Sequence, residues 1–183
     1  MRVLGISGSL RRDSFNTRLL RAAAAKLPPE AELELFTGLD EIPPYNEDAD
    51  PVPASVERLR ETIRSADALL ISTPEYNASI PGVLKNALDW ASRPFPHNSL
   101  RDQPVAVVGA STGIFGAVWA QAELRKVLNH TGAHVIDEEL PVGSAAAAFT
   151  EDDRLRDPEL GHRLDELVAA LVSEAATALP AAA

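Results

Sequence analysis

The sequence contains no cysteine among its 183 residues. This absence excludes disulfide frameworks, thiolate nucleophiles, iron–sulfur ligation and dithiol redox chemistry. A chain of this length is by default one domain, and such a domain can bury about 70% of the surface that its unfolded form exposes. We therefore expect a single domain over residues 1–183 that folds without a metal or a disulfide. Any redox chemistry must come from a bound cofactor.

Long apolar runs are also absent. Met1 leads into the short apolar run 3–6, and no later run approaches the length of about 18 residues that a membrane span needs. The formal net charge of −10 would repel phosphate backbones and anionic membrane surfaces. We expect a soluble, cytoplasmic protein that binds neither nucleic acid nor membranes.

The four histidines are scattered along the chain. His130 and His134 stand four residues apart, but Gly132 between them interrupts the helix that would align them, and no third ligand lies nearby. No metal site is predicted.

Short runs rich in apolar and β-branched residues alternate with stretches of helical period, which is typical of βαβ units around a parallel sheet. Strands are expected at residues 2–7, 32–36, 68–72, 105–110 and 135–136. Helices are expected at residues 15–26, 55–65, 81–91, 116–129 and 158–179. Residues 37–53 contain four prolines and are expected to form a long loop. The alanine patch 145–148 is low in complexity, and residues 180–183 are expected to be a disordered tail.

Five strands separated by helices predict a doubly wound sheet. Ligands of such sheets sit beyond the carboxyl ends of the strands, near the point where the strand order reverses. Function is therefore sought in the loops that follow residues 7, 72 and 110.

The loop after the first strand is rich in hydroxyl groups and carries two arginines just before a helix. A helix start offers unpaired N–H groups and a positive dipole end, and Arg11 or Arg12 can grip a phosphate with two hydrogen bonds. Further side-chain donors are Ser9, Ser14, Asn16 and Thr17. A plain helix cap by Ser14 or Asp13 explains the loop about equally well. Neither G-x-G-x-x-G nor Gly-Lys-Ser/Thr occurs, so the expected ligand is a terminal phosphate.

The loop after the third strand is the most informative segment. Pro74 ends the strand, Ser79 can cap the next helix, and Pro81 begins that helix. Between them, residues 75–78 form an exposed platform at the carboxyl edge of the sheet. A planar heterocycle needs flat apolar cover and backbone amides in its plane, and a Pro-Glu-Tyr-Asn turn supplies both. The alternative is that Tyr76 only holds the loop in place, and Trp90 is interpreted as a core residue.

The loop after the fourth strand, 109–116, is built mainly of small residues. They allow the backbone to approach a flat ligand, while Ser111 and Thr112, followed by Gly113, can donate to its carbonyl edge. An ordinary glycine-containing turn is the alternative. Three loops of this kind at one edge of the sheet favour a bound ligand.

Two sequence motifs carry a family resemblance. Gly8-Ser9-Leu10-Arg11 with Ser14-Phe15-Asn16, and the segments PEYNASIPG at 74–82 and LKNALDW at 84–90, resemble the NAD(P)H-dependent FMN reductase family. That family includes quinone, azo-dye and chromate reductases. The resemblance covers nearly the whole chain, since residues 151–155 and 157–160 are similar to the lead-in and start of the family's last helix.

The resemblance implies a flavodoxin-like fold, with a five-stranded parallel sheet in the order 2-1-3-4-5 and helices on both faces. It implies FMN with its phosphate in the first loop and its isoalloxazine ring against Pro74 to Asn77. The expected cofactor-binding residues are Ser9, Arg11, Ser14, Phe15, Asn16, Thr17, Pro74, Glu75, Tyr76, Asn77, Ser111, Thr112 and Gly113. It also implies a homodimer or homotetramer, with the helix opened by Pro81-Gly82 near the subunit interface.

One segment departs from a common version of the family pattern. Where that pattern has Gly-Gly-x-Arg-Ala-Gln, residues 116–121 read Gly-Ala-Val-Trp-Ala-Gln. A role that needs a cation at position 119 is therefore in doubt, and Trp119 offers instead a large face for packing or for an interface.

We expect an FMN-dependent oxidoreductase that passes hydride from NADPH or NADH to a quinone, a free flavin or a similar small acceptor. The exchange has two steps at one ring face, and no catalytic side chain is expected because the flavin N5 carries the chemistry. The main alternative is an electron carrier similar to flavodoxin, which the acidity of the chain also suits. A flavin-free interaction module and a Rossmann dehydrogenase fit the motifs less well.

Overall fold

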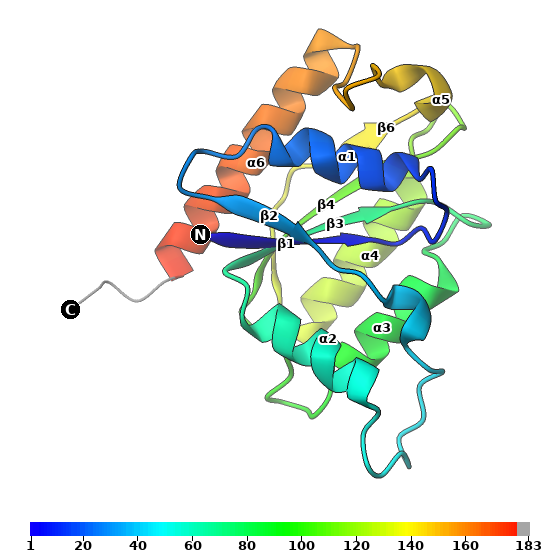
Figure 1. Cartoon of the computed structure of the whole chain (residues 1–183), viewed down its shortest axis with the longest axis vertical. Coiled ribbons are helices and arrows are strands. Elements are labelled where there is room, and N and C mark those ends of the chain that lie inside the picture. Colours follow the sequence, from blue (N-terminus) through cyan, green and yellow to red (C-terminus); the bar gives the residue numbers. More distant parts are fainter. Residues whose placement is uncertain (179–183) are drawn as a thin grey trace.

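The computed structural model describes residues 1–178, and its central feature is a parallel sheet in the order β2-β1-β3-β4-β5 (Figure 1). The predicted disordered tail at 180–183 lies outside the described residues. The strands are β1 Arg2–Ser7, β2 Glu32–Leu35, β3 Ala68–Thr73, β4 Pro104–Ala110, β5 His134–Val135 and β6 Leu140–Val142. The helices are α1 Phe15–Ala24, the 3₁₀ helix η1 Leu39–Glu41, α2 Ala54–Arg64, α3 Gly82–Ala91, α4 Val118–Thr131, α5 Ala145–Ala148 and α6 Pro158–Ala178.

Helices cover both faces of the sheet, as Figure 1 shows. α1 and α6 lie on one face, and α2, α3 and α4 lie on the other. The side chains of β3 alternate between the two layers. Leu69 and Ile71 pack with α2, α3 and α4, whereas Leu70 packs with α1 and α6. The predicted flavodoxin-like architecture and strand order are confirmed.

Burial along the strands explains their places in the sheet. β3 and β4 are buried along their whole length and are mostly apolar, as expected for central parallel strands that helices cover on both faces. β2 instead alternates exposed glutamates with half-buried leucines. This alternation is typical of a strand at the edge of a sheet, where β2 lies.

The fifth strand is split in two, which the sequence did not predict. β5 pairs with Pro104 and Val105, whereas β6 pairs with the other end of β4, at Val108–Ala110. β6 was missed because it has three residues and one of them is Pro141, a residue that argues against a strand. Both segments lie beside β4, so the predicted strand order holds.

Several predicted boundaries were also wrong. The alanine patch 145–148 forms the short helix α5, and η1 interrupts the predicted loop 37–53. α4 begins at Val118 rather than at Gly116, because Gly116 and Ala117 have the positive φ values 61° and 62°, which a right-handed helix does not accommodate. Pro81 precedes α3 rather than occupying its first position. Within residues 1–178, no helix is long and apolar enough to cross a membrane.

Candidate functional site at the carboxyl edge of the sheet

The loops that follow β1, β3 and β4 meet at one edge of the sheet, because these strands are neighbours and run parallel. Between them lies a pocket of about 120 Å³, here called the first pocket. Its lining residues are Ser9, Arg11, Ser14, Phe15, Asn16, Pro74, Glu75, Tyr76, Ala110, Ser111 and Thr112. Sequence reasoning missed Ala110 in this set, although it is the small residue that ends β4. Thr17, Asn77 and Gly113 were predicted but do not line the pocket.

A glycine allows the first two loops to approach each other. The backbone N–H of Gly8 donates to the carbonyl of Ser72 at 2.8 Å. A Cβ atom at Gly8 would lie 3.0 Å from Leu84 and 3.2 Å from Pro74, closer than carbon atoms normally approach. The loop after β1 therefore rests directly against Pro74, and the wall that both loops share depends on this glycine.

The start of α1 is capped by one of the predicted residues. The Ser14 hydroxyl accepts a hydrogen bond from the backbone N–H of Thr17 at 3.2 Å, and the Thr17 hydroxyl donates to Ser7 at 3.1 Å. The cap that the sequence offered as an alternative is thus present. The first-turn N–H groups that a helix cannot satisfy internally lie beside the first pocket, where they suit an anion.

Asn16 has a structural role that the sequence did not reveal. Its side chain is buried, its amide nitrogen donates to the carbonyl of Ala110 at 3.0 Å, and its oxygen accepts from the N–H of Ala110 and the hydroxyl of Ser72. An asparagine amide has two N–H donors, so one of them remains for a ligand. Asn16 therefore joins α1 to the ends of β3 and β4.

The loop after β3 contains a tight turn. Tyr76 and Ser79 exchange two backbone hydrogen bonds, of 3.0 and 3.2 Å, and the residues between them, Asn77 and Ala78, have φ values of 54° and 60°. Two positive φ angles in a two-residue connection are typical of a type I′ turn. The turn presents the Tyr76 side chain, which is 48% exposed. Ser79 does not cap α3, contrary to the prediction.

Glu75 links this loop to α4. Its carboxylate accepts hydrogen bonds from the backbone N–H groups of Trp119 and Ala120, at 3.0 and 3.1 Å. The residue before α4, Ala117, has no side chain that could cap the helix. Glu75 therefore caps α4 although it is distant from this helix in the sequence. No local sequence signal indicates such a contact.

Replacing Glu75 by alanine is expected to lower the free energy of unfolding by about 1–2 kcal/mol, because two N–H groups lose a charged acceptor at the positive end of a helix. Glu75→Gln keeps an acceptor and should lose less. Urea unfolding followed by circular dichroism measures both effects. Glu166→Ala, an exposed change on α6, is the control and should stay within about 0.5 kcal/mol of wild type. Equal stability of Glu75→Ala and the control would contradict the capping role.

The loop after β4 is supported by β6 and α5, two elements that the sequence did not predict. The backbone N–H of Ser111 donates to Val142, the N–H of Ala145 donates to Ser111, and the N–H of Ser144 donates to Gly113. A Cβ atom at Gly116 would collide with the backbone of residues 141–143. The loop is therefore held in place by the second half of the split strand.

An exposed apolar surface borders this loop. Ile114, Phe115 and Trp119 are 77%, 58% and 50% exposed, and the rings of Phe115 and Trp119 meet edge to face with their centroids 5.1 Å apart. Trp119, at the position where the common family pattern has arginine, thus contributes to an apolar surface. Within residues 1–178, no group of three or more histidines or acidic residues is arranged to hold a metal ion.

The comparisons with known proteins agree with this geometry. The family model described as NADPH-dependent FMN reductase matches residues 1–147. An NAD(P)H-dependent FMN reductase of Pseudomonas aeruginosa is 45% identical over 174 residues, which is 93% of each chain. A 2-hydroxy-1,4-benzoquinone reductase of a Burkholderia species is 37% identical over 163 residues, covering 84% of this chain and 88% of that protein.

A solved structure shows the same fold over almost the whole chain. FerB from Paracoccus denitrificans, a flavoenzyme NAD(P)H:(acceptor) oxidoreductase, superimposes with a TM-score of 0.84 and 38% identity. The match covers 96% of this chain and 97% of FerB. The chain therefore belongs to the family of NADPH-dependent FMN reductases, oxidoreductases in which FMN takes electrons from NAD(P)H.

Proposed function

We propose that the first pocket binds FMN, and that the chain uses it to reduce a quinone, a free flavin or a similar small acceptor with electrons from NADPH or NADH. The observation that carries this proposal is the convergence of the three loops on one pocket at the sheet edge. Donor and acceptor would use the same open face in turn, because the three loops hold the flavin by its phosphate and ring edges.

The donors at the start of α1 fit a terminal phosphate. Arg11 makes no ion pair within residues 1–178, and its guanidinium lies 5.9 Å from the centroid of the Phe15 ring. It is thus available for two charge-assisted hydrogen bonds to a phosphate dianion. The Ser9 hydroxyl and the free N–H groups of the first helical turn add neutral donors on the same wall.

The other two loops fit the ring. Pro74 is buried and supplies a flat apolar surface, while Ser111 and Thr112 offer hydrogen bonds from the opposite side of the pocket. Bound FMN would supply the two-electron chemistry at its isoalloxazine ring. The residues of the chain position the ring and leave one of its faces accessible beside Tyr76.

A quinone acceptor is supported by a relative whose name gives a benzoquinone as its substrate. The competing function, an electron carrier without nicotinamide activity, predicts a different result in one experiment. The FMN-loaded protein should lose its oxidised flavin absorbance within seconds when NADPH or NADH is added without oxygen. A flavin that stays oxidised with excess NADPH and with excess NADH would establish the carrier instead. A cytoplasmic location is part of this proposal and is tested by cell fractionation.

The Tyr76 side chain borders the face that donor and acceptor would share. Tyr76→Ala should raise KM for a quinone acceptor about two- to tenfold, since aromatic contacts contribute about 0.5–1.5 kcal/mol. FMN affinity should change less than twofold, and Tyr76→Phe, which keeps the ring, should resemble wild type. Steady-state kinetics and fluorescence titration measure the two quantities. If Tyr76→Ala weakens FMN binding by a larger factor than it raises the acceptor KM, Tyr76 contacts the flavin and not the acceptor.

We also propose a homodimer or homotetramer. Ile114, Phe115 and Trp119 form an exposed apolar surface beside the first pocket, and apolar surfaces of this kind commonly mark an interface. A groove of about 670 Å³ also runs between α3 and α4, lined on one side by Phe95, which is 73% exposed. Light scattering at micromolar concentration should give two or four times the chain mass of 19.6 kDa. A mass of one chain would contradict the assembly.

A further inference from the structure

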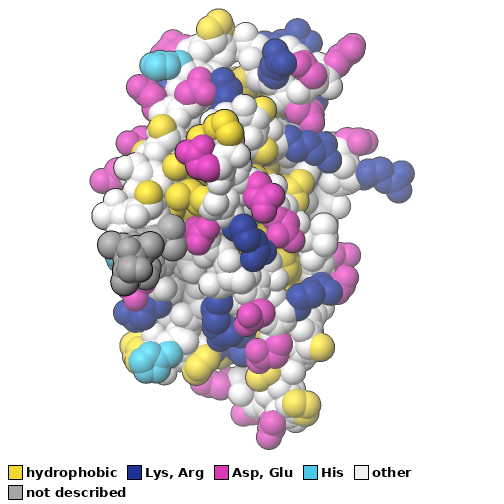
Figure 2. All heavy atoms as spheres, turned by 60° about the vertical axis from the view of Figure 1, so that its left-hand side comes forward, with side chains coloured by type: hydrophobic (Ala, Val, Ile, Leu, Met, Phe, Trp, Pro, Cys, Tyr) yellow, Lys and Arg dark blue, Asp and Glu magenta, His cyan; other side chains and the backbone are white. Residues whose placement is uncertain are grey.

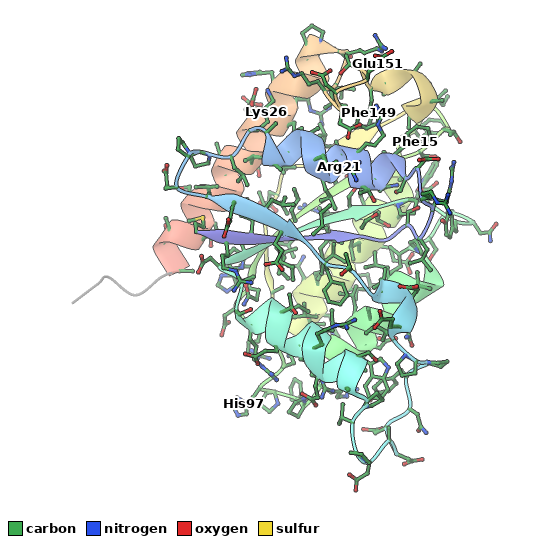
Figure 3. All side chains as sticks on the ribbon, viewed as in Figure 1. Phe15, Arg21, Lys26, His97, Phe149 and Glu151 are labelled. Atoms are coloured by element: carbon green, nitrogen blue, oxygen red, sulfur yellow. The ribbon has the colours of Figure 1, made fainter. Side chains whose placement is uncertain are left out.

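A second pocket, of about 500 Å³, lies beside the first pocket on the outer side of α1. Its lining residues are Arg11, Arg12, Asp13, Ser14, Phe15, Thr17, Arg18, Arg21, Glu151 and Asp153. Arg11, Ser14 and Phe15 line both pockets, so the two share a wall. Figure 3 shows Phe15 and Arg21 on α1, with Phe149 and Glu151 on the segment that faces them before α6.

The second pocket is lined by both basic and acidic side chains. Four arginines face three carboxylates, and one carboxylate, Asp153, is shared by Arg18 at 2.5 Å and Arg21 at 3.4 Å. Arg12 is exposed and makes no ion pair or side-chain hydrogen bond within residues 1–178. Basic and acidic side chains are also interspersed on the face shown in Figure 2. Arg11 belongs to the wall shared with the first pocket, so the three other arginines face three carboxylates. Among the described residues, Arg12 is the one of these three whose guanidinium is left free to bind an anion.

The far wall of the second pocket is held rigidly against α1. Arg18 donates to the carbonyl of Thr150 and lies over the Phe149 ring, 5.0 Å from its centroid. The rings of Phe15 and Phe149 are parallel within 3°. The Thr150 hydroxyl donates to Asp152 at 2.6 Å and lowers the pKa of that carboxyl group. The cationic side chains therefore face a preorganised wall, which reduces the entropy lost on binding.

The free guanidinium group of Arg12 suits an anionic group on a ligand that also contacts the flavin. NADPH and NADH differ only in the phosphate on the adenosine 2′ oxygen, which is a dianion. Guanidinium groups bind such a phosphate through paired hydrogen bonds, and arginine commonly accommodates the 2′-phosphate in other nucleotide sites. Arginine and Phe15 also offer flat surfaces on which an adenine ring can stack.

We propose that Arg12 and Arg21 bind the 2′-phosphate of NADPH and thereby make the protein prefer NADPH over NADH. This inference rests on the proposed function, because the nicotinamide end must reach the open flavin face. Arg11 takes the phosphate of FMN on the shared wall, and Arg12 and Arg21 take the second phosphate beyond it. Glu151 opposes the arrangement, since its exposed carboxylate lines the same pocket and repels the dianion.

Binding of fragments tests the proposal without catalysis. The FMN-loaded full chain is titrated by calorimetry, at low and at physiological salt, with 2′,5′-ADP and with 5′-AMP, which lacks the 2′-phosphate. The 2′,5′-ADP should bind at least about tenfold more tightly, and more weakly as salt rises. Arg12→Ala and Arg21→Ala should each weaken 2′,5′-ADP about fivefold and leave 5′-AMP unchanged. Arg154→Ala is the matched control, because Arg154 is exposed near this segment but does not line the second pocket.

Steady-state kinetics provide the second readout. Arg12→Ala should raise KM for NADPH about five- to tenfold and leave KM for NADH within twofold, while Glu151→Gln should lower KM for NADPH about two- to threefold. A damaged fold cannot improve KM, so the Glu151 variant separates binding from instability. Equal affinity for 2′,5′-ADP and 5′-AMP, or parallel shifts in both KM values, would overturn the assignment. If neither nucleotide reduces the flavin, the proposed function fails, and the fragment titration still decides whether the second pocket binds the phosphate.

Discussion

Replacing Asn16 by leucine is expected to lower the free energy of unfolding by about 3–5 kcal/mol, since a buried polar group left without its partner costs about 1–3 kcal/mol. The substitution leaves the N–H and carbonyl of Ala110 and the hydroxyl of Ser72 without the side chain that satisfies them. All three lie at the buried ends of β3 and β4, where water has little access.

Urea unfolding monitored by circular dichroism measures this effect. Ser72→Ala removes one of the three hydrogen bonds and should cost about 1 kcal/mol. Ser14→Ala removes the local helix cap and should cost about 0.5–2 kcal/mol, so it separates a cap effect from the role of Asn16. A loss below about 1.5 kcal/mol for Asn16→Leu would mean that solvent replaces the three bonds.

The fold was predictable where local pattern and burial agree. The central strands β3 and β4 are continuous apolar runs because both of their faces are covered, and the prolines of residues 37–53 correctly indicated a long connection. Parallel strands of a doubly wound sheet present their carboxyl ends at one edge, so the three loops were expected there, while the strand order came from the family resemblance. The central strands and the long connection could be predicted because each depends on a short stretch of sequence.

What was missed depends on contacts between distant residues. β6 has too little local signal to be recognised, and it exists because β4 offers a free edge over Val108–Ala110. The Glu75 carboxylate caps a helix that begins more than forty residues later, at Val118. Asn16 was expected to face a phosphate, but most of its hydrogen bonds go to the ends of two strands. Residue type alone cannot distinguish an asparagine that donates to a ligand from a buried asparagine that holds strand ends together by hydrogen bonds.

Replacing Arg11 by alanine is expected to weaken FMN binding about ten- to a hundredfold, because charge-assisted hydrogen bonds to a dianion contribute about 1.5–3 kcal/mol. Arg11 lines the first pocket, whereas Arg12 lines only the second. Arg12→Ala is therefore the matched control for Arg11→Ala. It should leave the Kd for FMN within twofold of wild type while it weakens the binding of 2′,5′-ADP.

Riboflavin, which lacks the phosphate, provides the control on the ligand side. Its Kd should be the same for wild type and Arg11→Ala, since the contacts proposed for the ring at Pro74 and Ser111 are unchanged. The folding stability should also be unchanged because Arg11 is exposed. Isothermal titration of the apoprotein with FMN and with riboflavin measures the four constants. If Arg11→Ala weakens both ligands equally, Arg11 supports the loop rather than the phosphate. If neither ligand is affected and Arg12→Ala weakens FMN, the two arginines have exchanged roles, and the second pocket loses the cation on which the proposed selectivity for NADPH depends.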